Sequence, residues 1–181
     1  NKNFKEAEIN SQMKPRVYSN LKKLWEKHGA HDFGRISQIF FGFCLVEKQF
    51  QIKIFQLTGR PDIVAVRNNK KFAFEVKTQS GSDVAIKNED LLGVKGYTEQ
   101  AIIAALSYPD LDCMWVLVKA NNIRAGKWPI AFLKQHSISS LEDELNESFQ
   151  KIIEKYFTTA YLGTTSLYDV FEEVCKLEKN K

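Results

Sequence analysis

The chain has 181 residues, enough for one domain that buries a hydrophobic core without disulfides or a structural metal. Hydrophobic residues make up 44% of it and charged residues 27%, as in ordinary globular proteins, and no apolar run approaches the roughly 20 residues that span a bilayer. The polar segment Asn1–Asn10 lacks the apolar stretch of a signal peptide, so we expect an intracellular, cytoplasmic protein with no membrane partner.

The charge and the cysteines narrow the function only a little. A formal net charge of +4 suits a protein that binds phosphate backbones, but many unrelated proteins share it. The three cysteines, Cys44, Cys113 and Cys175, lie far apart in the chain. An odd number without C-x-x-C spacing argues against a disulfide framework and against a zinc site.

Two helices are expected before the first strand. Residues 15–28 place apolar side chains on one face, with Pro15 in the first turn and Gly29 as the stop. Asp32 is then a candidate N-cap for a second helix that ends near residue 46. The first quarter of the chain is therefore predicted to be helical.

Three short strands follow these helices. Apolar and polar residues alternate over 50–54, which indicates a half-buried strand. After a break at 58–61, residues 62–67 are rich in β-branched side chains and predict a second strand. Two Asn residues at 68–69 favour a hairpin turn into a third strand over 72–77.

The second half of the chain is predicted to mix helices and strands. Residues 80–95 are polar and contain Gly, which favours a mobile loop or a short helix, and a helix is expected over 97–107. Buried strands are expected at 112–120 and 128–133, and a helical extension over about 139–179. This order predicts an α/β domain around a central mixed sheet.

Three charged side chains of the predicted hairpin carry the chemistry. Glu75 and Lys77 are two positions apart on a strand, so their side chains emerge on the same face, and the hairpin turn brings Asp62 near Glu75. Two close carboxylates repel each other unless a divalent cation lies between them. Oxygen ligands with no His or Cys nearby favour Mg²⁺ or Mn²⁺ over zinc.

A metal ion in this position would support phosphodiester hydrolysis. It polarises a phosphoryl oxygen and lowers the pKa of its bound water, which becomes the nucleophile. Lys77 would orient or deprotonate that water, or stabilise the charge that develops on the phosphate. Pro-Asp or Glu-x-Lys alone is common, and the alternative interpretation is a solvated, charged sheet face. The specificity lies in their combination at hairpin spacing.

At these residues the chain resembles the PD-(D/E)XK nuclease superfamily, which includes restriction endonucleases, Holliday junction resolvases and VRR-NUC nucleases. Pro61-Asp62 matches the PD element and Glu75-Val76-Lys77 matches the (D/E)XK element. The resemblance implies that Asp62, Glu75 and the backbone carbonyl of Val76 bind the metal.

The same resemblance implies the fold. We expect a restriction-endonuclease-like core of helix, three strands, helix and strand over about 33–120, with extra N- and C-terminal helices, in a single nuclease domain over 1–181. Members of the superfamily often act as dimers. The helices outside the core leave room for a homodimer contact or for DNA recognition.

Two helix positions that matter in the superfamily carry Gln in this chain, Gln38 and Gln100. The Gly-x-x-x-Glu element of junction resolvases falls at Gly34–Gln38, where this chain has an amide in place of the carboxylate. A second metal site is therefore in doubt. Gln100, in Tyr97-Thr98-Glu99-Gln100, resembles the helix Gln of resolvases and VRR-NUC nucleases and would assist catalysis by holding a water or a phosphate.

Basic residues near the motif are candidates for DNA binding. Arg60 stands beside the PD element, and Lys87 and Lys95 follow the (D/E)XK strand. Contacts from these side chains to phosphates would make the affinity for DNA depend on salt. A solvated basic surface is the competing interpretation for the two lysines.

The sequence thus predicts an Mg²⁺- or Mn²⁺-dependent DNA endonuclease, either restriction-like or acting on junctions or in repair. The long C-terminal extension favours restriction-like cleavage of duplex DNA. One alternative is a catalytically inactive nucleic-acid-binding or assembly module with the same fold, which Gln38 supports best. Another is a protein-interaction domain built on the amphipathic C-terminal helices, on which metal would have no effect.

Overall fold

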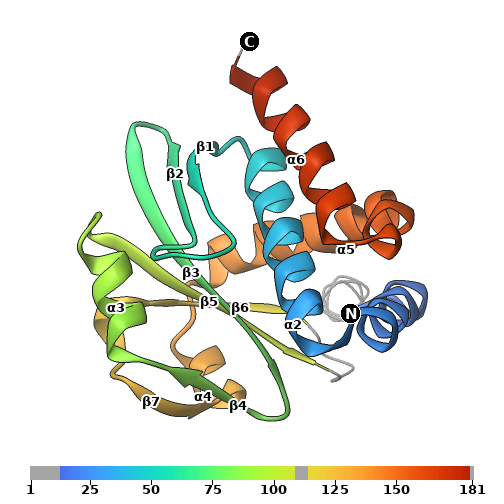
Figure 1. Ribbon diagram of the computed structural model, residues 1–181. Helices are drawn as coiled ribbons and strands as arrows, with labels where there is room; N and C mark the ends of the chain where they lie inside the picture. Colours follow the sequence, from blue (N-terminus) through green and yellow to red (C-terminus); the bar gives the residue numbers. More distant parts are fainter. Residues whose placement is uncertain (1–12, 109–113, 180–181) are drawn as a thin grey trace, which may run out of the picture.

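The protein is built around a five-stranded mixed sheet, seen in a computed structural model that describes residues 13–108 and 114–179 (Figure 1). The strand order is β1-β2-β3-β5-β6; the neighbours β3 and β5 pair in parallel, and the other neighbouring pairs of this sheet are antiparallel. The strands are β1 (Gln51–Phe55), β2 (Ile63–Arg67), β3 (Lys70–Ser80), β5 (Gln100–Tyr108) and β6 (Trp115–Lys119). The predicted α/β class and the central mixed sheet are confirmed.

Three long helices cover one face of the sheet. They are α2 (Pro15–Glu47), α5 (Ser139–Leu162) and α6 (Thr164–Lys179) (Figure 1). The two predicted N-terminal helices are confirmed as the arms of α2, which meet at a kink where Gly29 has φ 74° and ψ 175°. Asp32 lies inside the second arm, so its predicted N-cap role is wrong. Gly163, with φ 142°, separates α5 from α6 in the predicted C-terminal extension.

A thinner layer covers the opposite face. It consists of the two-stranded antiparallel sheet β4-β7 and short helices (Figure 1). Its elements are β4 (Asp83–Ile86), α3 (Asn88–Lys95), η1 (Ala120–Asn122), β7 (Gly126–Pro129) and α4 (Ile130–Gln135). Within the described ranges, no helix has the length and hydrophobicity needed to cross a bilayer.

The alternation of side chains along β3 divides the core between the two layers. Phe74 packs with Phe41 of α2 in the larger cluster, whereas Ala73 belongs to the smaller cluster with Val84 of β4. Glu75 has the same parity as Ala73, so its side chain faces the thinner layer that contains α3. The candidate site is therefore covered by short elements and not by the long helices.

The β2–β3 hairpin sets the register of the motif. Asn68 and Asn69 have φ of 52° and 60°, the left-handed conformation that a two-residue type I′ turn requires, so the predicted turn is confirmed. The last ladder pair of the hairpin is Ile63 with Phe74. One position further along, Asp62 faces Glu75, as the sequence predicted.

The structure corrects the elements that follow β3. The predicted helix over 97–107 is wrong, because most of these residues belong to β5, which begins at Gln100 and is a central strand buried on both faces. The helix after the third strand is α3, inside the segment that was expected to be a loop or a short helix. The order helix, three strands, helix, strand is thus kept by α2, β1, β2, β3, α3 and β5, with β4 inserted.

Two further predictions fall near the end of the sheet. Strand β6 confirms the described part of the strand expected at 112–120. The strand expected at 128–133 is only partly correct, because β7 ends at Pro129 and α4 begins at Ile130. Cys44 is buried in the core, and Cys113 and the polar segment 1–10 lie outside the described residues.

Candidate active site

Asp62 is the last residue of the loop between β1 and β2, which three amide hydrogen bonds hold in place. The backbone N–H of Gln56 donates to the carbonyl of Asp62 at 3.0 Å, and the side-chain Nε2 of Gln56 donates to the carbonyl of Pro61 at 2.6 Å. From α2, Nε2 of the buried Gln38 donates to the carbonyl of Gln56 at 2.7 Å. The loop therefore delivers Asp62 to the sheet in a fixed position.

The carboxylate of Asp62 is bound to the strand that carries the second half of the motif. Its Oδ2 accepts a hydrogen bond of 2.7 Å from the backbone N–H of Val76. The N–H and C=O of a strand residue leave the strand on the same side, so the carbonyl of Val76 is also directed toward Asp62. The three metal-binding groups that the sequence predicted are thus neighbours.

Glu75 and Lys77 lie on the same face of β3 and are in contact. The ammonium of Lys77 is 2.9 Å from Oε1 of Glu75, whose residue is only 4% exposed. The other oxygen, Oε2, is buried and accepts no hydrogen bond from the described part of the chain. A buried carboxylate oxygen without a donor is costly, and a bound cation would remove that cost.

Asp90 of α3 completes the cluster, although its sequence pattern did not predict a place in the site. Its side chain is fully buried, and its oxygens accept from Lys77 Nζ at 2.9 Å, Arg60 Nε at 3.1 Å and the backbone N–H of Lys87 at 2.8 Å. The one local signal was an acidic residue in the first turn of a short helix. That signal predicts a cap but not the two ion pairs.

Burial and charge shift the acidity of all four groups. Burial raises the pKa of Asp62 to about 6, and burial together with the charge of Asp62 raises that of Glu75 to about 7. Burial alone would lower the pKa of Lys77, but its bonds to Glu75 and Asp90 raise it. Burial would raise the pKa of Asp90, yet its donors, led by the Lys87 N–H and Lys77, lower it.

The family to which the protein belongs follows from its sequence match. The family model for the archaeal Holliday junction resolvase (Hjc) matches residues 57–151, just over half of the chain. The chain belongs to the archaeal Holliday junction resolvase family. The match confirms the predicted PD-(D/E)XK nuclease resemblance and places the chain among nucleases, and it includes Asp62, Glu75 and Lys77. No curated protein matches the chain.

The resolvase match favours one of the alternatives left open by the sequence. Restriction-like cleavage was preferred because the C-terminal extension is long, but the family favours a junction nuclease. Gln38 lies outside the matched residues, on α2, where it holds the loop of Asp62 through Gln56. The position is thus next to the site, as the resemblance implied, but its side chain has a structural partner.

Gln100 is the one predicted catalytic residue of this resolvase-family chain that the structure does not bring to the carboxylates. It begins strand β5, where it pairs with Phe72, whereas Glu75 pairs with Ile103. Three positions of a strand correspond to about 10 Å. Gln100 was selected as a helix residue, and that element is wrong.

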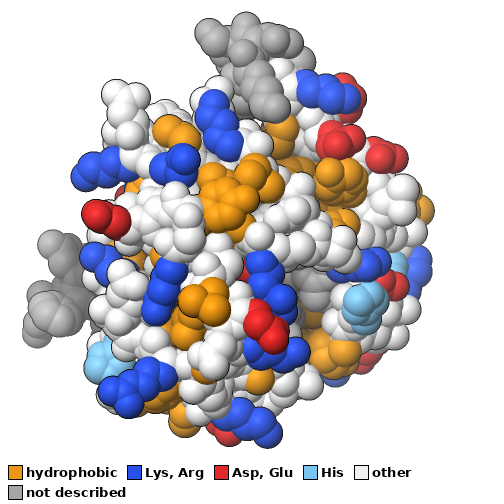
Figure 2. Space-filling view, turned by 60° about the vertical axis from the view of Figure 1, so that its left-hand side comes forward, with side chains coloured by type: hydrophobic (Ala, Val, Ile, Leu, Met, Phe, Trp, Pro, Cys, Tyr) orange, Lys and Arg blue, Asp and Glu red, His pale blue; other side chains and the backbone are white. Residues whose placement is uncertain are grey.

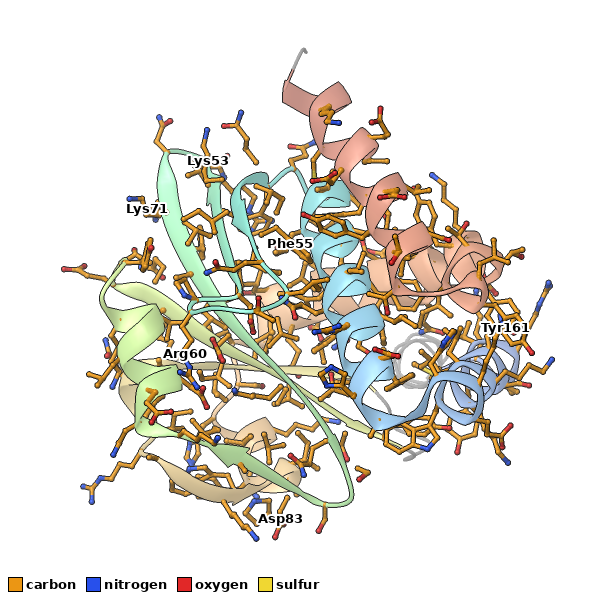
Figure 3. All side chains as sticks on the ribbon, viewed as in Figure 1. Lys53, Phe55, Arg60, Lys71, Asp83 and Tyr161 are labelled. Carbon is orange, nitrogen blue, oxygen red and sulfur yellow. The ribbon has the colours of Figure 1, made fainter. Side chains whose placement is uncertain are left out.

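The predicted DNA-binding residues lie on or against α3. Figure 3 shows Arg60 beside this helix, where its guanidinium contacts Asp90 and, at 3.2 Å, Glu89. A Cβ added at Gly93 would come within 2.8 Å of the Arg60 Cβ, so Gly93 allows this close packing. Lys87 precedes α3 and Lys95 ends it, and both are exposed. All three predicted residues therefore lie on or beside the helix that carries Asp90.

The residues present fit a hard divalent cation. In the described ranges no three side chains of the types His, Cys, Asp and Glu form a metal-binding group. The oxygen ligands that the site offers are the carboxylates of Asp62 and Glu75 and the carbonyl of Val76. Oxygen ligands of this kind are those of Mg²⁺ and Mn²⁺, which retain several waters. A cation would satisfy Oε2 of Glu75, which has no donor among the described residues, and offset the charge of Asp62, which after burial is the second cause of the raised pKa of Glu75.

Proposed function

We propose that this protein is a metal-dependent endonuclease that cuts four-way DNA junctions. The observation that carries the proposal is the convergence of Asp62, Glu75 and Lys77 at one buried position inside the region that matches the resolvase family. Two buried carboxylates with raised pKa values are an expensive arrangement for a surface that only binds DNA, because each repels the phosphates.

Each residue has a role in this proposal. Asp62, Glu75 and the Val76 carbonyl bind Mg²⁺ or Mn²⁺, which supplies an activated water and neutralises charge on the phosphate when it is bound. The N–H of Val76 and the loop amides keep Asp62 oriented. Lys77 lies beside Glu75, where its ammonium can orient the attacking water and stabilise the phosphate in the transition state.

The contacts of Lys77 support one of the roles that the sequence left open. Its contacts with Glu75 and Asp90 raise its pKa above the usual value for lysine. A lysine that stays protonated at neutral pH cannot accept a proton from water. In the metal-free protein, the two ion pairs of Lys77 therefore support orientation and charge stabilisation over a role as general base.

The surface around α3 is proposed to bind the DNA backbone. Figure 2, in which the side of the molecule that bears α3 comes forward, shows Lys and Arg side chains spread over this face. Arg60, Lys87 and Lys95 lie on or beside α3 and would contact phosphates next to the cleaved bond. Such contacts position the duplex without reading its sequence.

A homodimer remains part of the proposal. A four-way junction is resolved by two incisions in symmetry-related strands, and two identical subunits related by a two-fold axis supply two equivalent sites. Size-exclusion chromatography with light scattering, with and without junction DNA, measures this state directly. A cytoplasmic location is also part of the proposal, because a nuclease that acts on junctions in cellular DNA must reach that DNA.

The deciding experiment is cleavage of a synthetic four-way junction and of supercoiled plasmid, with Mg²⁺, Mn²⁺ or EDTA. We expect metal-dependent cutting of the junction by the wild type, and a loss of at least about 100-fold in Asp62→Ala and Lys77→Ala. Matched controls are Asp83→Asn and Lys22→Ala, which change exposed residues of the same types on β4 and α2. Both controls are expected to cut at the wild-type rate.

The second candidate function gives a different pattern. The amide of Gln38 in place of a carboxylate supports a catalytically inactive module that binds nucleic acid with the same fold. In that case no metal would promote cutting, and wild type and both alanine variants would bind the junction equally well. That result would contradict the nuclease.

A further inference from the structure

One buried carboxylate joins the residue proposed to bind phosphate to the residue proposed to act on it. Oδ1 of Asp90 lies 3.1 Å from Nε of Arg60, and Oδ2 lies 2.9 Å from Nζ of Lys77. The Asp90 side chain is 1% exposed, whereas those of Arg60 and Lys77 are 41% and 24% exposed. Asp90 is thus the buried member of the group Arg60, Lys77 and Asp90, and it binds the two partly exposed cations from the interior of the protein.

We propose that Asp90 is a positioning residue, which sets the spacing between Arg60 and Lys77 so that a phosphate bound by the first is presented to the second. This inference rests on the proposed nuclease function and deepens it. Asp90 touches neither DNA nor the reacting atoms, because it is buried beneath both cations.

The second partners of the two cations explain why Asp90 is needed. Besides Asp90, the guanidinium of Arg60 contacts only Glu89 among the described acidic groups, at 3.2 Å, and that side chain is 66% exposed. Exposed ion pairs restrain a side chain weakly. Among the described residues, Glu75, at 2.9 Å, would be the remaining ion-pair partner of Lys77. Without Asp90, both long side chains would therefore lose the contact that links them.

The position of Asp90 is itself firmly held. Its Oδ2 also accepts the backbone N–H of Lys87 at 2.8 Å, which fixes the carboxylate to the first turn of α3. That helix packs closely against Arg60 at Gly93. A purely structural role as a helix cap is therefore the competing explanation, and the test must separate the two.

Asp90→Asn should affect DNA affinity and cleavage rate in different directions. Asp90→Asn removes a negative charge near the DNA-binding surface, so the affinity for DNA should stay equal or rise slightly. The amide keeps one oxygen, which can still accept from the Lys87 N–H and from Lys77, but its NH2 group then faces Arg60. Both ion pairs of Asp90 are lost, so Arg60 and Lys77 become less ordered. We expect the cleavage rate of bound junction to fall by about tenfold or more, since such bonds are roughly twice as strong as neutral ones.

Glu89→Gln is the matched control. It removes the same charge from the same guanidinium of Arg60, but Glu89 is exposed and has no contact with Lys77. Binding of junction DNA should change as in Asp90→Asn, and cleavage should continue at the wild-type rate. A general charge effect would make the two variants alike.

The experiment compares wild type, Asp90→Asn and Glu89→Gln in three measurements. These are single-turnover cleavage of a four-way junction with Mg²⁺, the Kd for the same junction in EDTA by fluorescence anisotropy, and the melting temperature. Slow cleavage by Asp90→Asn alone, with a Kd no weaker than that of the wild type, supports the proposal. Cleavage by Asp90→Asn within twofold of the wild type overturns it.

The remaining outcomes are also decisive. Equal slowing in Glu89→Gln overturns the proposal in favour of a charge effect. A lower melting temperature together with weaker binding and slower cleavage in Asp90→Asn overturns it in favour of a cap. No cleavage by the wild type contradicts the proposed function and this inference together, whereas the earlier outcomes leave the nuclease intact.

Discussion

The carboxylate of Asp62 accepts a hydrogen bond of 2.7 Å from the backbone N–H of Val76, across the ends of two neighbouring strands. This bond joins the two halves of the motif, which are separated by a hairpin in sequence. The β2–β3 ladder ends with the pair Ile63 and Phe74. Beyond that pair, the N–H of Val76 points toward β2 and is taken up by the carboxylate of Asp62. The side chain of Asp62 therefore takes the place of a backbone acceptor at the end of the ladder, while its negative charge lies in the site.

Replacing Asp62 should separate its structural bond from its charge. Asp62→Asn keeps an oxygen for the Val76 N–H and removes a buried charge, so in EDTA its free energy of unfolding should equal or exceed that of the wild type. Asp62→Ala leaves that N–H without its acceptor and should be less stable by about 1–3 kcal/mol. Urea denaturation of both variants measures the difference. Equal stability of Asn and Ala variants would show that the bond contributes nothing.

The stability of the metal-free protein should fall as the pH rises from about 4.5 to 7.5. The folded-state pKa values of Asp62 and Glu75, about 6 and about 7, lie above the ordinary values of 3.8 and 4.5, so the folded state binds more protons than the unfolded state in this window. Stability then decreases with pH, by about 1.4 kcal/mol for each unit of pKa shift. Urea titrations at several pH values in EDTA measure the slope.

Glu75→Gln is the control for this slope, because it removes the titrating group whose pKa burial and the charge of Asp62 raise to about 7. The slope in the variant should be clearly smaller. Metal and protons compete for the same oxygens, so Mn²⁺ should stabilise the wild type more at pH 8 than at pH 5. Mn²⁺ should stabilise Glu75→Gln only slightly at either pH. A wild-type slope of the opposite sign would contradict the burial of these carboxylates.

Gln38 should matter for stability through the loop of Asp62. Gln38→Ala removes the donor to the Gln56 carbonyl and should lower the free energy of unfolding by about 1–3 kcal/mol. Gln38→Glu should be at least as harmful at pH 8, since it directs a carboxylate at a carbonyl oxygen. The exposed Gln135 provides the control substitution to Ala. If Gln38→Glu were as stable as the wild type, the side chain would not be holding this loop.

The motif could be predicted because its geometry is local. Period-two alternation places Glu75 and Lys77 on one face, and the hairpin turn at Asn68 and Asn69 returns the chain to Asp62. A turn that needs positive φ leaves a clear sign in the residue types. The register of two adjacent strands then follows from the turn alone.

The rest depended on distant partners. Residues 101–108 of β5 are buried on both faces, so the strand shows no alternation, and its Ala-rich run has the propensity of a helix. Only pairing with β3 makes it a strand. Asp90 was missed for a related reason, because its ion pairs with Arg60 and Lys77 join residues far apart in the sequence.

The kink of α2 gives a matched pair of glycine substitutions. Gly29→Ala should lower the free energy of unfolding by about 1 kcal/mol or more, because the φ of 74° and ψ of 175° are accessible to Gly but strained for Ala. Gly34→Ala, inside the second arm with no atom within 4 Å of the added Cβ, should raise it by about 0.5–1 kcal/mol. Urea denaturation distinguishes these signs. Loss of stability in both variants would contradict the open space at Gly34.

Lys87 and Lys95 should contribute to DNA affinity through phosphates alone. Each change to Ala should weaken junction and duplex binding by similar factors and reduce the slope of log affinity against log salt by about 1. Fluorescence anisotropy between low and moderate salt measures the slope, with Lys22→Ala on the first arm of α2 as the control. An unchanged slope in both variants would place the DNA elsewhere, because a lysine that neutralises a phosphate must release a counterion. Loss of junction binding without loss of duplex binding would instead assign these lysines to recognition of the branch point.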